Sequence, residues 1–335
     1  MSTSKTDLSS ALLSVTDLSV QINTGKALVR PVDRVTFSLR SGRTLGIVGE
    51  SGCGKSMLCR ALIRLLPPGG SIARDAEIRF NGVDMATLSE KSMNRIRGRE
   101  IAMVFQNPMT ALNPVMRVGK QIAENLLLHT TTARKDLPAA TVYFLRQAGM
   151  SQPDRYVDTY PYQLSGGMRQ RAAIAVALCC RPKLLLADEP TTALDVTVQA
   201  EILRVFDRLQ SKSGMAIILV THNLAIAATH TDEIAVMYGG KIVEQAPTDV
   251  LFRQMRHPYT LSLMSAIPRL DATAGEPFST IEGQPPDLSK PQPGCGFADR
   301  CRYVRPLCHH TAPPVSRDSN HHRFACFFPL GMGQD

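Results

Sequence analysis

The hydrophobic and polar positions along the chain fall into two kinds of pattern. In residues 12–22 and 34–40, apolar and polar side chains alternate, as in antiparallel strands that bury one face. Residues 44–49, 183–190 and 215–222 instead contain short continuous apolar runs, each followed by a helix-compatible stretch. Such runs are typical of parallel strands buried on both faces. The pattern therefore predicts an α/β fold with a parallel core sheet and an antiparallel layer beside it.

The rest of the pattern divides the chain into domains. An Asn-Gly pair at positions 81–82 follows a short strand-like run and predicts a tight turn. Residues from about 90 to 178 show a mostly helical pattern, which predicts an inserted helical subdomain. Pro, Gly, Ser and Thr are frequent in residues 270–294, as in linkers. We therefore predict four parts: a disordered N-terminus (1–10), the main α/β domain (11–269), the linker (270–294) and a small cysteine-bearing C-terminal domain (295–335).

The composition indicates a globular chain of 335 residues with a sizeable core, since 44% of the residues are apolar and 20% are charged. Residues 172–180 come closest to a membrane span, but this run is too short and lies between Arg171 and Arg181. The N-terminus has no basic region followed by an apolar one, so no secretory signal is predicted. We expect a cytoplasmic chain that does not cross a membrane by itself.

The formal net charge of +9 raises the question of a nucleic-acid-binding protein. The chain has no aromatic-rich basic stripe and no recognisable nucleic-acid-binding motif. A solvated basic surface with some attraction to anionic phosphates or lipid head groups explains the charge more simply. We therefore expect no nucleic-acid partner.

The strongest motif is GESGCGKS, which fits the P-loop pattern G-x-x-x-x-G-K-[ST] and follows a predicted strand. Glycines let such a loop curl until backbone N–H groups point at phosphate oxygens, and the following helix adds its positive end. The lysine would reach the β- and γ-phosphates, and the serine hydroxyl would bind Mg²⁺. The motif predicts contacts to a nucleotide from Gly49, Glu50, Ser51, Gly52, Cys53, Gly54, Lys55 and Ser56.

The apolar run LLLADEP supplies carboxylates for the same chemistry. It delivers Asp188 to the Mg²⁺ side of the site, and Glu189 follows at once. Phosphoryl transfer to water needs a metal bridge, fixed positive groups and a residue that orients the attacking water. We predict Glu189 as the general base. The alternative is a carboxylate that only favours a helix start.

The stretch LSGGMRQR places a Ser and two Gly at a predicted helix start, which is a second anion-binding arrangement. With this motif the sequence resembles ABC-transporter ATPases, whose six motifs occur here in the family's order. The resemblance assigns these residues as follows: Gly49 to Ser56 as Walker A, Gln106 as the Q-loop, Ser165, Gly166 and Gly167 in the signature, Asp188 and Glu189 as Walker B and base, Asp195 in the D-loop and His222 as the switch histidine.

The resemblance implies a head-to-tail dimer in which each ATP lies between one subunit's Walker A and the other's signature. Ser165, Gly166 and Gly167 would then contact the partner's γ-phosphate. His222 would contact the γ-phosphate as a catalytic residue, and Asp195 would couple the two sites. Gln106 would act in catalysis and as a Mg²⁺ ligand, and would link the site to the helical subdomain.

Three further stretches, residues 105–114, 180–203 and 256–268, are similar to the ATP-binding subunits of bacterial dipeptide and oligopeptide importers. This resemblance implies two membrane permease subunits, a second ATPase that is identical or paralogous, and, indirectly, an extracytoplasmic solute-binding protein. The chain would lie on the cytoplasmic face of the inner membrane. Related machinery imports nickel, haem or antimicrobial peptides, so the cargo stays open. A soluble ABC ATPase is a distant alternative, since no coiled-coil insertion and only one Walker A are visible.

Four cysteines lie near the C-terminus: Cys295, Cys301, Cys308 and Cys326. Disulfides are disfavoured in a reducing cytoplasm. The intervals of five, six and seventeen residues lack the C-x-x-C pairs typical of zinc and suit a larger cluster. The resemblance implies a structural or regulatory 4Fe-4S cluster, with zinc or no metal as alternatives. The other cysteines are expected to pack as small side chains, although Cys53 lies in the P-loop and is a candidate for oxidation.

Overall fold

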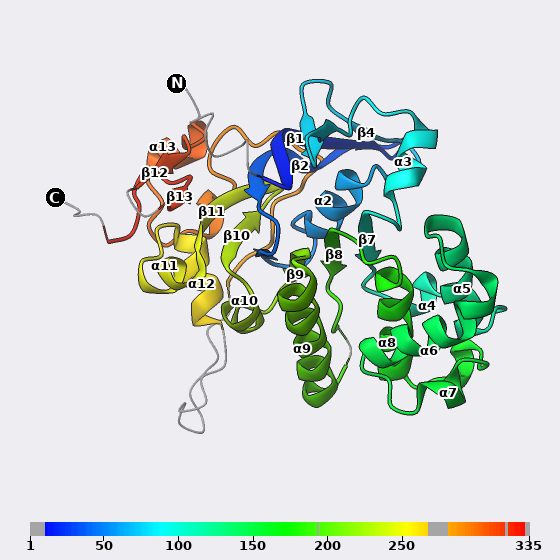
Figure 1. Cartoon of the computed structure of the whole chain (residues 1–335). Helices are drawn as coiled ribbons and strands as arrows, with labels where there is room; N and C mark the ends of the chain where they lie inside the picture. Colours follow the sequence, from blue (N-terminus) through cyan, green and yellow to red (C-terminus); the bar gives the residue numbers. More distant parts are fainter. Residues whose placement is uncertain (1–10, 193, 267–280, 319–320, 332–335) are drawn as a thin grey trace.

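The computed structural model describes residues 11–192, 194–266, 281–318 and 321–331, and two sheets form its centre (Figure 1). The predicted disordered N-terminus and residues 270–280 of the predicted linker lie outside the described residues. The smaller sheet is antiparallel and follows the order β2-β1-β5-β6, with β4 also paired to β1. Its strands are β1 (Leu13–Asn23), β2 (Leu28–Leu39), β4 (Gly70–Ile72), β5 (Glu77–Phe80) and β6 (Val83–Asp84).

The larger sheet contains eight strands in the order β12-β13-β11-β10-β3-β9-β8-β7. The five strands from β10 to β7 are parallel, and the other three add antiparallel pairs at one edge. The strands are β3 (Thr44–Val48), β7 (Ile101–Val104), β8 (Leu184–Asp188), β9 (Ala216–Thr221), β10 (Glu233–Tyr238), β11 (Lys241–Pro247), β12 (Ser316–Arg317) and β13 (Arg323–Phe324).

The continuous apolar runs form parallel strands because both faces of this sheet are covered. In β8, Leu184 and Leu186 join a core shared with the smaller sheet, whereas Leu185 and Ala187 join a core shared with helices. Successive side chains of a strand point to opposite faces, so a strand between two cores needs apolar residues at every position. The predicted α/β class is therefore confirmed.

Helices cover the sheets and form a separate group at one side of the molecule (Figure 1). The α-helices are α2 (Lys55–Leu62), α3 (Glu90–Ile96), α4 (Pro108–Ala111), α5 (Val118–His129), α6 (Leu137–Gln147), α7 (Pro153–Tyr156), α8 (Gly166–Leu178), α9 (Val196–Ser213), α10 (Leu224–His230), α11 (Thr248–Arg253), α12 (Pro258–Ser265) and α13 (Pro306–His310). Three short 3-10 helices are η1 (Arg134–Asp136), η2 (Pro161–Gln163) and η3 (Ala298–Arg300). None of the helices described is long and apolar enough to span a membrane.

Helices α4 to α8 form the group on the right of Figure 1, and they occupy most of the interval that the sequence pattern indicated as helical. The interval also contains β7, which pairs with β8 at the edge of the larger sheet. Its buried residues Ile101, Ala102 and Val104 give the strand the same apolar character as its neighbour. The strand separates the short helix α3 from the group α4 to α8, which follows it.

The C-terminal segment packs on the opposite side, beside α11 and α12 (Figure 1). Strand β13 pairs with β11, so the segment extends the larger sheet. Phe297 is buried against Tyr238 and Tyr259, with ring centroids 5.3 Å from each. The cysteine-bearing segment is therefore anchored to the α/β core by both backbone pairing and aromatic packing.

Candidate active site

The P-loop connects β3 to α2 and approaches neighbouring backbone too closely for most side chains. A Cβ atom on Gly49 would lie 2.2 Å from the carbonyl oxygen of Met237. Gly54 has a φ of +109°, and a Cβ atom there would lie 1.9 Å from the carbonyl oxygen of Pro31. Both positions thus require glycine, because any other residue would displace the loop.

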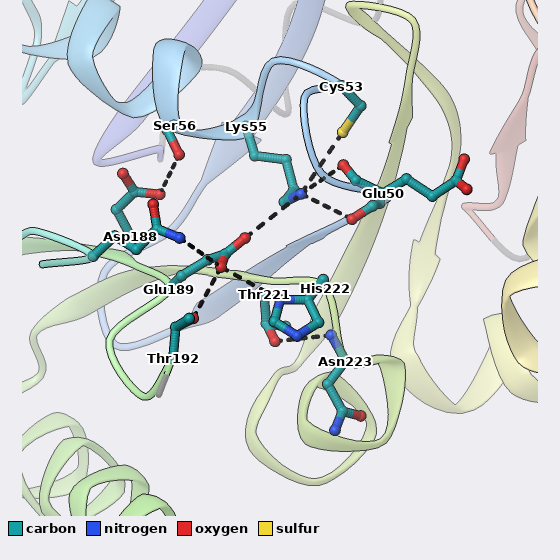
Figure 2. A network of polar contacts seen from close by, with 12 residues as sticks. Glu50, Cys53, Lys55, Ser56, Asp188, Glu189, Thr192, Thr221, His222 and Asn223 are labelled. Atoms are coloured by element: carbon teal, nitrogen blue, oxygen red, sulfur yellow. Dashed lines mark hydrogen bonds and ion pairs between the residues drawn. The ribbon is translucent and has the colours of Figure 1, made fainter. Parts of the chain in front are cut away.

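Lys55 is the first residue of α2, and its ammonium group turns back into the loop (Figure 2). The Nζ atom donates to the carbonyl oxygens of Gly49 and Glu50 at 2.8 and 2.9 Å. It also lies 3.8 Å from Glu189 Oε1, and the Lys55 side chain is only 4% exposed. The positive charge is therefore held at the centre of the loop, where phosphate groups would bind.

The side chains of Ser56 and Asp188 place a hydroxyl oxygen and a carboxylate oxygen next to each other beside Lys55 (Figure 2). Ser56 Oγ donates to Asp188 Oδ1 at 2.8 Å. Burial raises the pKa of the Asp188 carboxyl above its ordinary value, although the hydrogen bond from Ser56 opposes this. A hydroxyl and a carboxylate are oxygen ligands of the kind that Mg²⁺ prefers, so this pair fits the ion.

Glu189 gathers polar side chains from separate loops around one carboxylate. Its Oε2 atom accepts hydrogen bonds from Gln106 Nε2 at 3.2 Å and Thr192 Oγ1 at 2.9 Å. His222 Nδ1 lies 3.3 Å from the same oxygen, and the Glu189 side chain is 9% exposed. Three predicted residues, Gln106, Glu189 and His222, thus meet in one network although 116 positions separate the first and last of them.

The backbone of Glu189 is in the left-handed region, with a φ of +45°. A non-glycine residue in this region is uncommon and strained, and such residues cluster at functional sites. The Glu189 N–H donates to the carbonyl oxygen of Val220 at 3.1 Å, which fixes the residue at the end of β8. In this conformation the carboxylate points toward Lys55 (Figure 2).

The signature residues lie outside the polar network around Glu189. Ser165 is the N-cap of α8, and its Oγ accepts from the N–H of Met168 at 3.4 Å. Ser165 and Gly166 are both exposed. Asp195 is likewise an exposed N-cap, of α9, and accepts from the N–H of Val198 at 2.9 Å.

The four C-terminal cysteines line one cavity of about 20 Å³ together with His257 and Phe297. Burial raises the pKa of the Cys295 and Cys301 thiols and raises that of Cys326 to about 11. Within the described part of the chain, no three His, Cys, Asp or Glu side chains are arranged to hold a metal ion. The four cysteines therefore share a cavity, as the predicted metal centre requires, but the described residues do not form a coordination site.

Three residues at the site were not singled out from the sequence. Thr192 donates to the Glu189 carboxylate, and it begins the stretch TALD, residues 192–195, that matches the D-loop and ends at Asp195. Tyr259 lies outside the six motifs, yet its Oη accepts a hydrogen bond from the N–H of Glu50 at 2.9 Å. Arg300 contacts the Glu50 carboxylate from a position 250 residues away, for which the sequence carries no local signal.

A P-loop on a central parallel strand, with Asp188 and Glu189 at the end of a strand in the same sheet, defines a P-loop nucleoside triphosphatase. Two family models refine this class. The model described as "ABC transporter" matches residues 32–192, and the model described as "Oligopeptide/dipeptide transporter, C-terminal region" matches residues 243–308.

Relatives match nearly the whole chain. The dipeptide transport ATP-binding protein DppD of Bacillus subtilis is 44% identical over 316 residues, 94% of this chain and 94% of that protein. The oligopeptide transport ATP-binding protein OppD of Escherichia coli is 45% identical over 320 residues, 96% of this chain and 94% of that protein. The chain therefore belongs to the ABC transporter family, as an ATP-binding subunit of the oligopeptide/dipeptide type that hydrolyses ATP to drive transport.

A solved structure agrees with this assignment at the level of the fold. The ATP-binding cassette MJ0796, in a dimeric state with ADP and phosphate bound, has a TM-score of 0.64 and 24% identity. The match covers 70% of this chain and 98% of that one, so the fold of the cassette is shared.

Proposed function

We propose that this chain powers an importer of dipeptides or oligopeptides. The names of the relatives DppD and OppD and the family match at residues 243–308 support this cargo. Nickel, haem and antimicrobial peptides are the alternative cargoes. The observation that carries the ATPase role is the convergence of Lys55 and Glu189, 3.8 Å apart, beside the Ser56–Asp188 pair.

In this proposal the P-loop binds the phosphates of ATP through its backbone N–H groups, from Gly49 to Ser56, and through the Lys55 ammonium group. Ser56 and Asp188 would hold Mg²⁺, which supplies charge neutralisation at the phosphates when bound. Gln106 is proposed as a further contact on the metal side. Its amide nitrogen donates to Glu189 at 3.2 Å, so the amide oxygen is the atom that would serve as a Mg²⁺ ligand.

Glu189 is the proposed general base, since its carboxylate is the group that could accept a proton from the attacking water. The bonds from Gln106 and Thr192 orient that carboxylate. His222 is the proposed contact to the γ-phosphate. Its side chain is 55% exposed, so it can reach a ligand without leaving Glu189.

The complete site is proposed to form between two ATPase subunits. Ser165 and Gly166, which are exposed, and Gly167, which is half-buried, form a helix start that could bind the γ-phosphate in a partner's site. Asp195, exposed at the start of α9, would couple the two sites. The second subunit would be a copy of this chain or a paralogue.

The assembly is proposed to include two membrane permease subunits, with an extracytoplasmic solute-binding protein that delivers the cargo. The chain would then sit at the cytoplasmic face of the bacterial inner membrane. The rival reading is an ABC ATPase that acts away from membranes. Co-purification of this chain with integral membrane proteins would favour the transporter. If no membrane protein co-purifies in mild detergent, an ABC ATPase that acts away from membranes would be favoured.

For the C-terminal segment we propose a 4Fe-4S cluster held by Cys295, Cys301, Cys308 and Cys326. The four thiols line one cavity, and thiolates are the usual ligands of such clusters. Zinc is the alternative and requires four closely converging ligands. Anaerobically purified protein should be brown, with absorbance near ~400 nm and about four irons per chain. Colourless protein with one zinc per chain would show that the four cysteines hold zinc and that the cluster proposal is wrong.

The transport proposal is tested with the chain co-purified with its permease subunits and placed in proteoliposomes. ATP-dependent accumulation of a labelled dipeptide or oligopeptide is expected, and the Glu189→Gln variant should lose it. Nickel and haem are measured in the same vesicles. Accumulation of nickel or haem without peptide would show that the cargo proposal is wrong while leaving the ATPase assignment intact.

A further inference from the structure

A bidentate ion pair joins the cysteine-bearing segment to the P-loop. Arg300 ends the 3-10 helix η3, directly before Cys301, and its two terminal nitrogens donate to the two carboxylate oxygens of Glu50 at 2.6 and 3.0 Å. Glu50 is the second residue of the P-loop motif. The Arg300 side chain is 4% exposed and that of Glu50 is 26% exposed, so the pair is largely shielded from solvent.

Every N–H donor of Arg300 has a partner, which fixes the direction of the guanidinium group. Besides the two bonds to Glu50, its Nε atom donates to the carbonyl oxygen of Glu282 at 2.8 Å. The terminal nitrogens also donate to Tyr238 Oη at 3.2 Å and to the carbonyl oxygen of Ile281 at 3.0 Å. Because a guanidinium group has five donors, these five bonds leave no freedom to reorient.

Glu50 is held in turn at all three of its polar groups. Its N–H donates to Tyr259 Oη at 2.9 Å, and its carbonyl oxygen accepts from Lys55 Nζ at 2.9 Å. Its carboxylate is held by Arg300. Tyr259 is fully buried in the aromatic cluster that includes Phe297, three residues before Arg300. Two of the three fixed points on Glu50 thus depend on segments beyond the family's nucleotide-binding motifs.

The charge of Glu50 makes this contact relevant to nucleotide binding. The Glu50 carboxylate places a negative charge on the same loop that must attract the negatively charged phosphate groups. Arg300 neutralises that charge with a paired, directional contact. Without the guanidinium group, the carboxylate would be partly buried without its partner or would swing toward solvent and move the loop backbone.

We propose that Arg300 is a positioning residue for the ATP site: through Glu50 it holds the P-loop in its phosphate-binding conformation, so the cysteine-bearing segment sets the affinity for ATP. Arg300 lies outside the P-loop, and its five hydrogen bonds all go to protein groups. It acts through the Glu50 backbone and the Lys55 ammonium group that this backbone anchors. The proposal rests on ATP binding at the P-loop, as proposed above.

The test compares Arg300→Gln, Arg300→Lys and the control Arg302→Gln in the full-length chain. Arg302 lies two residues away in the same segment and is exposed. The dissociation constant for ATP should rise about tenfold or more in Arg300→Gln, because a charged hydrogen-bonded contact is lost. It should rise less in Arg300→Lys, which keeps the charge but not the fork, and should stay within about twofold in Arg302→Gln.

Two further readouts separate positioning from general destabilisation. In steady-state hydrolysis, Arg300→Gln should raise KM for ATP far more than it lowers kcat, since Glu189 and its partners are untouched. In a double-mutant cycle, Arg300→Gln should have little further effect once Glu50→Gln is present, because the guanidinium group acts through that carboxylate. If Arg300→Gln does not fold, Arg300→Lys and Glu50→Gln carry the same comparison.

The outcomes distinguish this inference from the proposed function. A wild-type chain that does not bind ATP, or binds it as well after Lys55→Ala, would remove the proposed nucleotide site. A wild-type chain that binds ATP while folded Arg300→Gln binds it with unchanged affinity would overturn only the role of Arg300. An equal loss of affinity in Arg302→Gln, or full additivity with Glu50→Gln, would also overturn it.

Discussion

The ammonium group of Lys55 lies 3.8 Å from the carboxylate of Glu189, and the two side chains are 4% and 9% exposed. Two opposite charges so deeply buried are each compensated by the other. Phosphate groups entering the P-loop would take over as partners of Lys55. The Glu189 carboxylate would then keep Gln106, Thr192 and His222 at Oε2, and Oε1, released from Lys55, would be the oxygen left to accept a proton.

The Glu189→Gln variant should therefore bind ATP but hydrolyse it about 10²–10⁴-fold more slowly, since the proton acceptor is lost. Binding should persist because Lys55 keeps its bonds to Gly49 and Glu50. The two properties are measured by equilibrium ATP binding and single-turnover hydrolysis. Lys55→Ala serves as the contrasting variant and should weaken binding itself. Hydrolysis at the parental rate by Glu189→Gln would remove Glu189 from the base role.

His222→Ala should lower kcat by about 10-fold or more, because a proposed contact to the γ-phosphate during the reaction is lost, whereas the P-loop and Lys55 keep most of the affinity for ATP. The imidazole Nδ1 lies 3.3 Å from Glu189 Oε2 but touches no P-loop residue by a hydrogen bond. His230→Ala is the control, because His230 is the last residue of α10, the helix that begins two residues after His222, and its Nδ1 lies 2.8 Å from Asp207 Oδ2 instead. Equal effects of both substitutions on kcat would mean that disturbance of α10, and not a catalytic contact, accounts for the loss.

Ser165→Ala should abolish most ATPase activity of the assembled transporter, although it removes only an N-cap contact from the chain itself. Loss of a serine N-cap costs about 1 kcal/mol of stability. Ser89→Ala is the control, since Ser89 caps α3 by the same type of bond, to the N–H of Ser92. Both variants should melt at similar temperatures, but only Ser165→Ala should lose activity. If Ser89→Ala is equally inactive, Ser165 has no special role between subunits.

Local patterns in the sequence were sufficient for much of this fold. Continuous apolar runs predicted β3, β8 and β9, and the Asn-Gly pair predicted the turn between β5 and β6, where Asn81 and Gly82 both have positive φ. These elements could be predicted because burial of both strand faces and the geometry of a tight turn each leave a pattern in consecutive residues of the sequence. The hairpin of β10 and β11 was missed, although Gly239 and Gly240 separate two apolar runs and carry positive φ.

The site was predictable only in part, for a physical reason. Glycine positions in the P-loop and the carboxylates after β8 are encoded locally, so a motif could identify them. Convergence of Gln106 and His222 on Glu189 depends on how distant loops meet, and only family resemblance indicated it. The contact between Arg300 and Glu50 needs the C-terminal segment to fold back onto the edge of the larger sheet, where β13 pairs with β11. No local periodicity can report such a contact.

The cysteines of the ATPase domain should differ widely in reactivity, because their environments shift the thiol pKa in opposite directions. Burial raises the pKa of Cys53 above its ordinary value despite the nearby Lys55. The pKa of Cys180 is lowered, chiefly by its hydrogen-bonding contact with Cys179, at an Sγ–Sγ distance of 3.8 Å. Only the thiolate reacts with iodoacetamide, so the lower pKa gives the faster reaction at neutral pH.

At pH 7, Cys180 should therefore be alkylated at least about tenfold faster than Cys53, as followed by peptide mass spectrometry of the native chain. The rate at Cys53 should keep rising as the pH passes 9, whereas the rate at Cys180 should level off at a lower pH than that of Cys53. Cys59 is fully buried with a strongly raised pKa, and it should stay unlabelled as the control for an intact fold. Rapid labelling of Cys53 at pH 7 while Cys59 stays protected would instead mean that the P-loop thiol is ionised and open to oxidation.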